Sequence, residues 1–392
     1  MKKLRSFGIA TTPDEMPKPG PDSQNAALIY QTAIRLKAAI KFPRPMLISD
    51  SHLQAKLDAY VKSNQPVMDL VRKASALPDC NFNRDWSLGP RLAHFEFPAL
   101  REFTKLAVLI AEREAHAGRF GEAFAWLEVG RKISVHVREP SLIAYSASIS
   151  CELTVLRELQ REIREYCSYP QFVKLSRQFC ETFPALPYLR NALSEGVLSV
   201  RIAMADIGSG RVKAEEIIDP GHSSEDLTTP DGRLLFALRV PSVRLRLEQN
   251  HLTTYRRAVE AIPADPKDLL TTIKATQALD EIKPDRFGVG DLAGIFLPWF
   301  EPSARSLVSL AATRNLTRQG LDVYVIKAKT GSFPKEIDKT RALGDGPLYR
   351  EVTDVQTRFG WLHPLQLRPQ YHRRRRPPTA IGNQGRSAQT FR

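Results

Sequence analysis

The sequence predicts a mainly α-helical protein, and two observations carry that prediction. Apolar residues recur at three- and four-residue spacing along most of the chain, which is the period of an amphipathic helix. Gly, Pro, Ser and Asp gather in short stretches between these segments, and no strand-rich region precedes residue 331. With 392 residues and 42% hydrophobic composition, the chain can bury a sizeable core. We therefore expect a multi-helix domain with a small C-terminal α+β appendage and a disordered tail.

The N-terminal part is expected to begin with a flexible leader. Residues 1–24 are polar and rich in proline. The stretch "NAALIYQTAIRLKAAI" (25–40) then shows helical spacing, and Asn25 is placed to cap that helix. Two shorter helices are expected next, "SHLQAKLDAYVKS" (51–63) and "PVMDLVRKASAL" (66–77), the second with Pro66 at its first position, where a missing N–H removes no helical hydrogen bond.

Residues 98–138 are predicted to form a helical hairpin. Two amphipathic helices meet at "AGRFGE" (117–122), where Gly118 can end the first. The layout resembles one tetratricopeptide hairpin, but no second copy follows at the expected period, and such arrays need about three repeats to be stable. An ordinary antiparallel hairpin is the alternative. The candidate contact surface for a protein partner consists of Arg119, Phe120, Glu122 and Trp126.

The rest of the chain is divided by one polar boundary. A long helix over 141–166 is apolar at first and then charged, as if its second half left the core. Further helices are expected at 170–182, 187–207, 233–261, 266–281 and 303–329. The predicted domains are therefore a helical domain (25–207), a linker (208–232), a helical region (233–330), a small appendage (331–358) and a disordered basic tail (359–392).

No motif in the sequence carries a recognisable chemistry. The loop at 78–97 places Trp86 near His94, and an enzyme of unknown type could use this loop site, with a packed loop histidine as the alternative. "GVGDLAG" (288–294) has the spacing of a dinucleotide-binding turn, but a charged, proline-broken stretch precedes it where a strand is required. The four cysteines form no C-x-x-C pair. We therefore predict no catalytic residue, no cofactor and no metal.

Much of the net positive charge of the chain lies in its C-terminal tail. The formal charge is +14, and residues 360–392 contribute seven arginines and no acidic residue. Arg373, Arg374, Arg375 and Arg376 are the candidate contacts to a phosphate backbone, for which a steep salt dependence is expected. Nucleic-acid binding is ranked below an unidentified protein partner.

Four short motifs occur in a recognisable order along the chain. They are "NAALIYQTA" (25–33), Trp86 with Gly89, "GRFGEA" (118–123) and "TGSFPKEID" (330–338). Together they resemble a family of large, uncharacterised helical proteins of planctomycete-type bacteria. The resemblance implies a helical fold over most of the chain and brings no activity with it. The last helix with "GSFP" is also similar, by layout, to the globular end of type II secretion pseudopilins.

The resemblance gives the basic tail another interpretation. Family C-termini continue as "DGFxLYSxGxNxxDDGG", and the codons of residues 360 onward, shifted forward by one nucleotide, permit "DGFILYSFGPNITDDGG". We hypothesise that residues 359–392 are read out of frame. The four consecutive arginines would then stand where an acidic glycine turn belongs.

The sequence favours a non-catalytic helical interaction or scaffold protein. No apolar run is long enough for a membrane span, so a cytoplasmic location is expected for the chain as written. Members of the family it resembles often begin with a membrane anchor. A membrane-anchored or envelope location is therefore expected if the start is truncated.

Overall fold

The structure is a computed structural model of the whole chain. It describes residues 1–37, 51–213, 216, 238, 240–263, 271, 272, 274 and 300–333. All of these belong to the first of two compact units, Met1–Gly344; the second unit, Asp345–Arg392, lies outside the described residues. Helices make up most of the described part, and no strand occurs in it, which confirms the mainly α-helical prediction.

The described part contains ten α-helices and four short 3-10 turns. The helices are α1 (Lys2–Ser6), α2 (Ala26–Leu36), α3 (Ser51–Ser75), α4 (Glu96–His116), α5 (Phe120–His136), α6 (Leu142–Tyr166), α7 (Pro170–Glu181), α8 (Ser194–Ser209), α11 (Pro241–Ala261) and α14 (Phe300–Thr330). The 3-10 turns are η1 (Pro13–Glu15), η2 (Asp22–Gln24), η3 (Trp86–Arg91) and η4 (Asn191–Leu193).

Side-chain caps and glycines set several helix ends. The Asn25 side chain accepts a hydrogen bond from the Ala27 N–H at 3.1 Å, which confirms the predicted cap of α2. Gly118 has φ +72°, so the chain can leave α4 and start α5 within three residues. At α6, the Ser141 hydroxyl accepts from the backbone N–H of Ile143 at 3.2 Å. Local chemistry therefore fixes where these helices begin and end.

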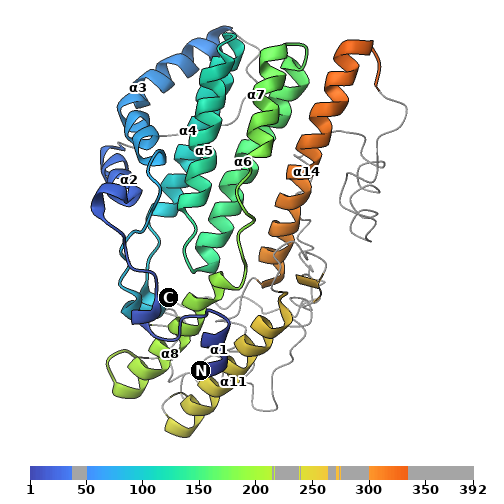
Figure 1. Cartoon of the computed structure of the whole chain (residues 1–392). Coiled ribbons are helices and arrows are strands. Elements are labelled where there is room, and N and C mark those ends of the chain that lie inside the picture. The colour runs from blue at the N-terminus through green and yellow to red at the C-terminus, as the bar shows by residue number, and fades with distance from the viewer. Residues whose placement is uncertain are drawn as a thin grey trace, which may run out of the picture. The chain divides into compact units, whose positions relative to one another are not determined.

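The larger hydrophobic core lies among α2 to α7. In Figure 1, α4, α5 and α6 run side by side, α3 packs against α4 and α5, and α14 packs along α6. Phe103, Leu127 and Phe172 are fully buried in this core. A Cβ added to Gly130 would lie 2.8 Å from the Cγ2 atom of Val155, so this glycine allows the close approach of α5 to α6.

A second core joins α6 and α14 to the segments around α8 and α11. Its buried residues include Tyr145 and Ile149 of α6, Val197 of α8, Tyr255 of α11 and Leu307 of α14. α6 and α14 therefore contribute buried residues to both cores.

The expectation of a flexible leader over residues 1–24 is wrong. Leu4 and Ile9 are 2% and 1% exposed and pack into the second core, while Met16 packs against Leu198 of α8. The Ala10 N–H also donates to the Ser194 hydroxyl at 3.1 Å. These few apolar residues hold the segment in place despite its proline-rich, polar composition.

Two expectations about helix extent are also corrected. Residues 51–75 form the single helix α3 with Pro66 inside it, where we expected two helices. The charged second half of α6 stays in the core: Glu158 and Glu162 are 8% and 2% exposed. Arg161 pairs with Glu158 and with Glu112 of α4, so part of this buried charge is compensated.

The later predictions are met in part. The helices at 170–182 and 303–329 correspond to α7 and α14, and α8 begins later than the predicted 187–207 helix. Gly210, with φ +72°, caps α8 where the linker was expected to start. Most of 214–239, most of 264–299 and all of 334–392 lie outside the described residues, and so do most of the expected linker, appendage and tail.

Candidate functional site

The two residues of the predicted loop site, Trp86 and His94, contact different neighbours. Trp86 begins η3 and packs against the small cluster of Ala10, Met16 and Leu198. The His94 ring is stacked on Phe97, with ring centroids 5.0 Å apart, and its side chain is 5% exposed. The two aromatic rings therefore contribute to different contacts.

His94 pairs with a carboxylate that the sequence did not predict. Its Nε2 atom lies 2.8 Å from an oxygen of Glu195 in α8. The Glu195 backbone N–H donates to the Pro140 carbonyl at 3.0 Å, which ties α8 to the turn between α5 and α6. Within the described part of the chain, the His94 Nδ1 atom has no hydrogen-bond partner.

A buried ion-pair cluster centres on Arg84. Its side chain is 4% exposed, pairs with Glu139, and places Nη2 3.1 Å from Glu96. The guanidinium also lies over the Phe97 ring, 5.0 Å from its centroid. Burial raises the pKa of Glu139, and the nearby Arg84 opposes that shift. This arrangement holds loop 78–97 against the α5–α6 turn.

A pocket of about 460 Å³ opens next to this turn. Its walls come from three parts of the chain: the N-terminal segment (8–17), the α5–α6 turn with the start of α6 (138–145), and residues 186–194, which end at the first residue of α8. The polar lining residues are Glu15, Arg138, Glu139, Tyr145, Tyr188, Asn191 and Ser194. Apolar lining comes from residues such as Met16, Leu186 and Ala192. This mixture of an apolar wall with a few polar groups is typical of a small-molecule site.

Tyr145 is the most enclosed aromatic residue of the lining. It is 3% exposed, and its hydroxyl has no hydrogen-bond partner among the described residues. Burial raises the pKa of this hydroxyl, and the positive charge of Arg138 opposes the shift. The group is therefore a hydrogen-bond donor at any physiological pH.

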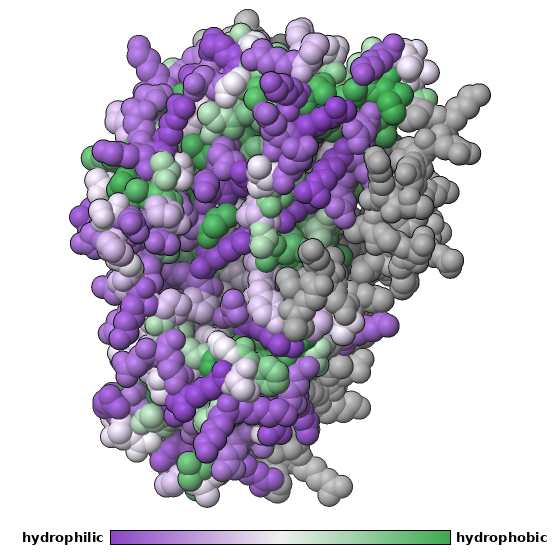
Figure 2. Space-filling view, viewed as in Figure 1, coloured by the Kyte–Doolittle hydropathy of each residue, from purple (hydrophilic) through white to green (hydrophobic). Residues whose placement is uncertain are grey.

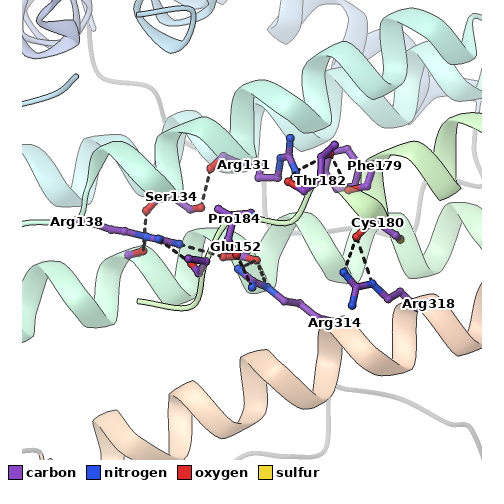
Figure 3. A network of polar contacts seen from close by, with 12 residues as sticks. Arg131, Ser134, Arg138, Glu152, Phe179, Cys180, Thr182, Pro184, Arg314 and Arg318 are labelled. Carbon is purple, nitrogen blue, oxygen red and sulfur yellow. Dashed lines mark hydrogen bonds and ion pairs between the residues drawn. The ribbon is translucent and has the colours of Figure 1, made fainter. Parts of the chain in front are cut away.

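Arg138 links the pocket to a network of arginines shown in Figure 3. Glu152 of α6 lies between Arg138 and Arg314 of α14: Oε1 is 2.5 Å from Nη2 of Arg314, and Oε2 is 3.8 Å from Nη2 of Arg138. Arg314 also donates to the Pro184 carbonyl at 2.7 Å. Together these contacts fasten α14 to α6 and to the segment after α7.

The predicted contact surface on the hairpin is not an exposed aromatic face. Phe120 and Trp126 are each 5% exposed, because Phe120 packs in an aromatic cluster with Phe172 and Trp126 lies in the larger core. Arg119 and Glu122 are exposed and pair with Glu114 and Arg72 respectively. A helix period alone does not say which face a third helix covers, so the sequence did not indicate the burial of Phe120 and Trp126. Figure 2 shows mainly hydrophilic residues on the viewed face, with hydrophobic ones in small separate groups.

The other predicted features are placed as follows. Arg373 to Arg376 and "GVGDLAG" lie outside the described residues. In the described ranges, no three His, Cys, Asp or Glu residues are grouped so as to hold a metal ion. All four cysteines are free thiols. Among the helices described, none is both long and apolar enough to cross a membrane.

The pocket residues were missed by sequence reasoning. Arg138 and Glu139 stand at the end of a predicted helix, and their charge before Pro140 was the only local signal. Tyr145 looked like an ordinary apolar position of its helix.

Comparison with protein-family models, curated proteins and solved structures returned no match.

Proposed function

We propose that this protein is a non-catalytic helical interaction protein whose recognition site is the 460 Å³ pocket beside the α5–α6 turn. One observation carries the proposal: three segments far apart in sequence converge there around polar lining residues such as Arg138, Asn191 and Ser194. The proposal moves the recognition site from the hairpin surface to the pocket.

A non-catalytic role is supported by how the buried titratable groups are used. The His136 ring bridges the Tyr30 hydroxyl, at 3.1 Å, and the Leu77 carbonyl, at 3.0 Å. Glu139 and Glu152 are each paired with arginine. These contacts hold helices and loops together, which favours a structural role for each group.

An enzyme remains the second candidate, because His94 lies 2.8 Å from the Glu195 carboxylate and such a pair can act as a general base. Neither residue is part of the pocket lining, while the neighbouring Ser194 is. This placement makes the pair a support behind the pocket wall in our proposal. An association with the cell envelope, a cytoplasmic location and nucleic-acid binding through Arg373 to Arg376 stay predictions from the sequence alone.

Ligand-observed ¹⁹F NMR with a fluorinated fragment library tests the proposal. Asn191 lines the pocket and is exposed, so Asn191→Trp should narrow the opening without disturbing the core. We expect a subset of fragments to broaden with the unmodified protein and to recover sharp lines with the variant. Fragments that bind both proteins equally, or none that binds either, would refute a pocket-based function. His94→Gln should leave fragment binding unchanged.

A further inference from the structure

The charges of the pocket lining are balanced within the protein. The lining has three charged residues, Glu15, Arg138 and Glu139. With their ion-pair partners they form a set of four carboxylates and four guanidinium groups, which belong to Glu15, Glu96, Glu139, Glu152, Arg5, Arg84, Arg138 and Arg314. A charged ligand would therefore lose hydration in the pocket without meeting a net counter-charge.

Two groups of this set are unbalanced by themselves, and they offset each other at the α5–α6 turn. Arg84 serves two carboxylates, Glu139 of the lining and Glu96. Glu152 serves two guanidinium groups, Arg138 of the lining and one of α14. Because Arg138 and Glu139 are neighbours in sequence, the excess positive charge and the excess negative charge lie side by side.

Two more charges stand behind the lining and have opposite signs. Arg190 lies over the ring of Tyr188, 5.7 Å from its centroid. Glu195 follows Ser194 of the lining and pairs with His94. Neither Arg190 nor Glu195 lines the pocket, and their opposite signs keep its surroundings close to neutral.

The accessible hydrogen-bonding group of the lining is the side chain of Asn191. It is exposed, and no hydrogen bond engages this side chain in the described part of the chain. Two other polar groups of the lining are already used: the Ser194 hydroxyl accepts from the Ala10 N–H at 3.1 Å, and the Tyr188 hydroxyl donates to the Pro263 carbonyl at 3.3 Å. A carboxamide has N–H donors and a carbonyl acceptor, the same kinds of group as a peptide bond. Asn191 is therefore suited to bind an amide.

The apolar part of the lining that solvent reaches consists mainly of rings. Pro17 is exposed, and Pro140, Leu186 and Tyr188 are half-buried. Rings of this kind line the grooves that bind proline-containing peptides in the polyproline II conformation. The backbone amides of such peptides have no internal hydrogen bonds, so their carbonyls are free to accept from a donor such as Asn191. A volume of about 460 Å³ suits a segment of a few residues.

We infer that the pocket binds a short, uncharged, proline-containing segment of a protein partner, with a backbone amide of that segment at Asn191 and a proline ring against Tyr188 and Pro140. The inference rests on the proposed function, since it names the chemistry of the partner for the same pocket. The balanced charge, the unbonded carboxamide and the ring surfaces each favour this class of partner.

Capped peptides of the form acetyl-Pro-Pro-X-amide test the inference by saturation-transfer NMR titration on the full chain. Two matched pairs change mainly the charge: X is methionine or lysine in the first pair, and asparagine or aspartate in the second. We expect the methionine and asparagine peptides to bind at least about fivefold more tightly than their charged partners. Replacing both prolines by alanine should weaken binding about three- to tenfold, because a more flexible peptide loses more conformational entropy when it binds.

Variants of the protein test the contact at Asn191. Asn191→Leu keeps a side chain of similar size and removes both hydrogen-bonding groups, so it should weaken binding of the neutral peptides about three- to tenfold. Asn191→Trp should abolish binding by narrowing the opening. Because Asn191 is exposed, both variants are expected to fold, and circular dichroism checks their helical content. Arg177→Ala removes an exposed arginine of α7 outside the pocket and should leave binding unchanged.

Several outcomes overturn the inference, and they differ in what they leave standing. Charged peptides that bind as tightly as their neutral partners, or alanine peptides that bind as tightly as proline peptides, would refute the class of partner. If Asn191→Trp still blocks them, the pocket function survives. Binding unchanged by Asn191→Leu would refute the amide contact. If no peptide binds but fragments of the NMR library do, the inference fails alone; if neither binds, the proposed function fails with it.

Discussion

The buried carboxyl of Glu162 should make the stability of this protein fall as pH rises. Glu162 is 2% exposed, and among the described residues neither of its oxygens has a hydrogen-bond partner. Burial raises its pKa to about 9, with the negative charge of Glu158 adding to the shift. The folded protein therefore keeps a proton on Glu162 at pH values where the unfolded chain has released it.

The size of the effect follows from proton linkage. Between the unfolded pKa near 4.5 and the folded value of about 9, the folded state holds one proton more than the unfolded state. The free energy of unfolding then decreases by up to about 1.4 kcal/mol per pH unit. Glu162→Gln keeps the shape and removes the ionisation. Relative to the unmodified protein, the variant should gain up to about 3 kcal/mol between pH 5.5 and pH 8.

Urea unfolding followed by circular dichroism at several pH values measures this difference. Glu181→Gln is the matched control, because it removes the same charge from an exposed position at the end of α7. The control should show no pH-dependent gain. A Glu162→Gln variant whose stability stays parallel to that of the unmodified protein from pH 5.5 to 8 would contradict the reasoning, since Glu162 would then ionise alike in both states.

Three further substitutions or titrations probe other parts of the structure. Glu152→Gln should destabilise the protein by about 3–5 kcal/mol in urea unfolding, because it leaves two arginines without their buried acidic partner, while Arg177→Ala at an exposed pair should cost less than about 1 kcal/mol. Gly130→Ala should lower the free energy of unfolding by about 1–3 kcal/mol, because the added Cβ would meet α6. Gly320→Ala, with open space around the added Cβ in α14, should raise it by about 0.4–1 kcal/mol. Equal melting temperatures for the two variants would contradict the packing argument. Burial lowers the pKa of His136 to about 4, so its ring signals in NMR should stay constant from pH 7.5 to 5.5, and a midpoint above pH 6 would show that the ring is solvated.

Local signals predicted the helices well where a single residue decides the outcome. Asn25 caps α2 and Gly118 ends the first helix of the hairpin, each within its own turn of the chain. Composition gave the wrong prediction for the expected leader, where a few buried apolar residues, such as Leu4 and Ile9, fix a segment that is polar overall.

The candidate site could not be predicted because its contacts join distant parts of the sequence. Glu152 and Arg314 are 162 positions apart, and His94 and Glu195 are 101 apart. Nothing near any of these residues indicates its partner. Charged residues in a helix normally predict a solvated face, and Glu162 departs from that rule because α6 is covered on several sides. Pairing at this range is set by tertiary packing, which a period or a motif does not encode.

The end of α7 and the segment that follows it have an unusual consequence for tolerance to mutation. Arginines of α5, α14 and the α5–α6 turn donate hydrogen bonds to its backbone carbonyls, those of Cys180, Thr182, Pro184 and Ala185. Every amino acid offers the same carbonyl oxygen, so the carbonyl contacts do not depend on side chains. Side chains of the segment add contacts at two positions, since Arg131 also donates to the Thr182 hydroxyl and Arg314 lies over the Phe183 ring. Saturation mutagenesis should therefore find Ala185, which is exposed, open to most replacements, while the arginine that holds it accepts almost none. At the contact between Arg138 and Ala185, substitution would therefore be restricted at the arginine and tolerated at the alanine.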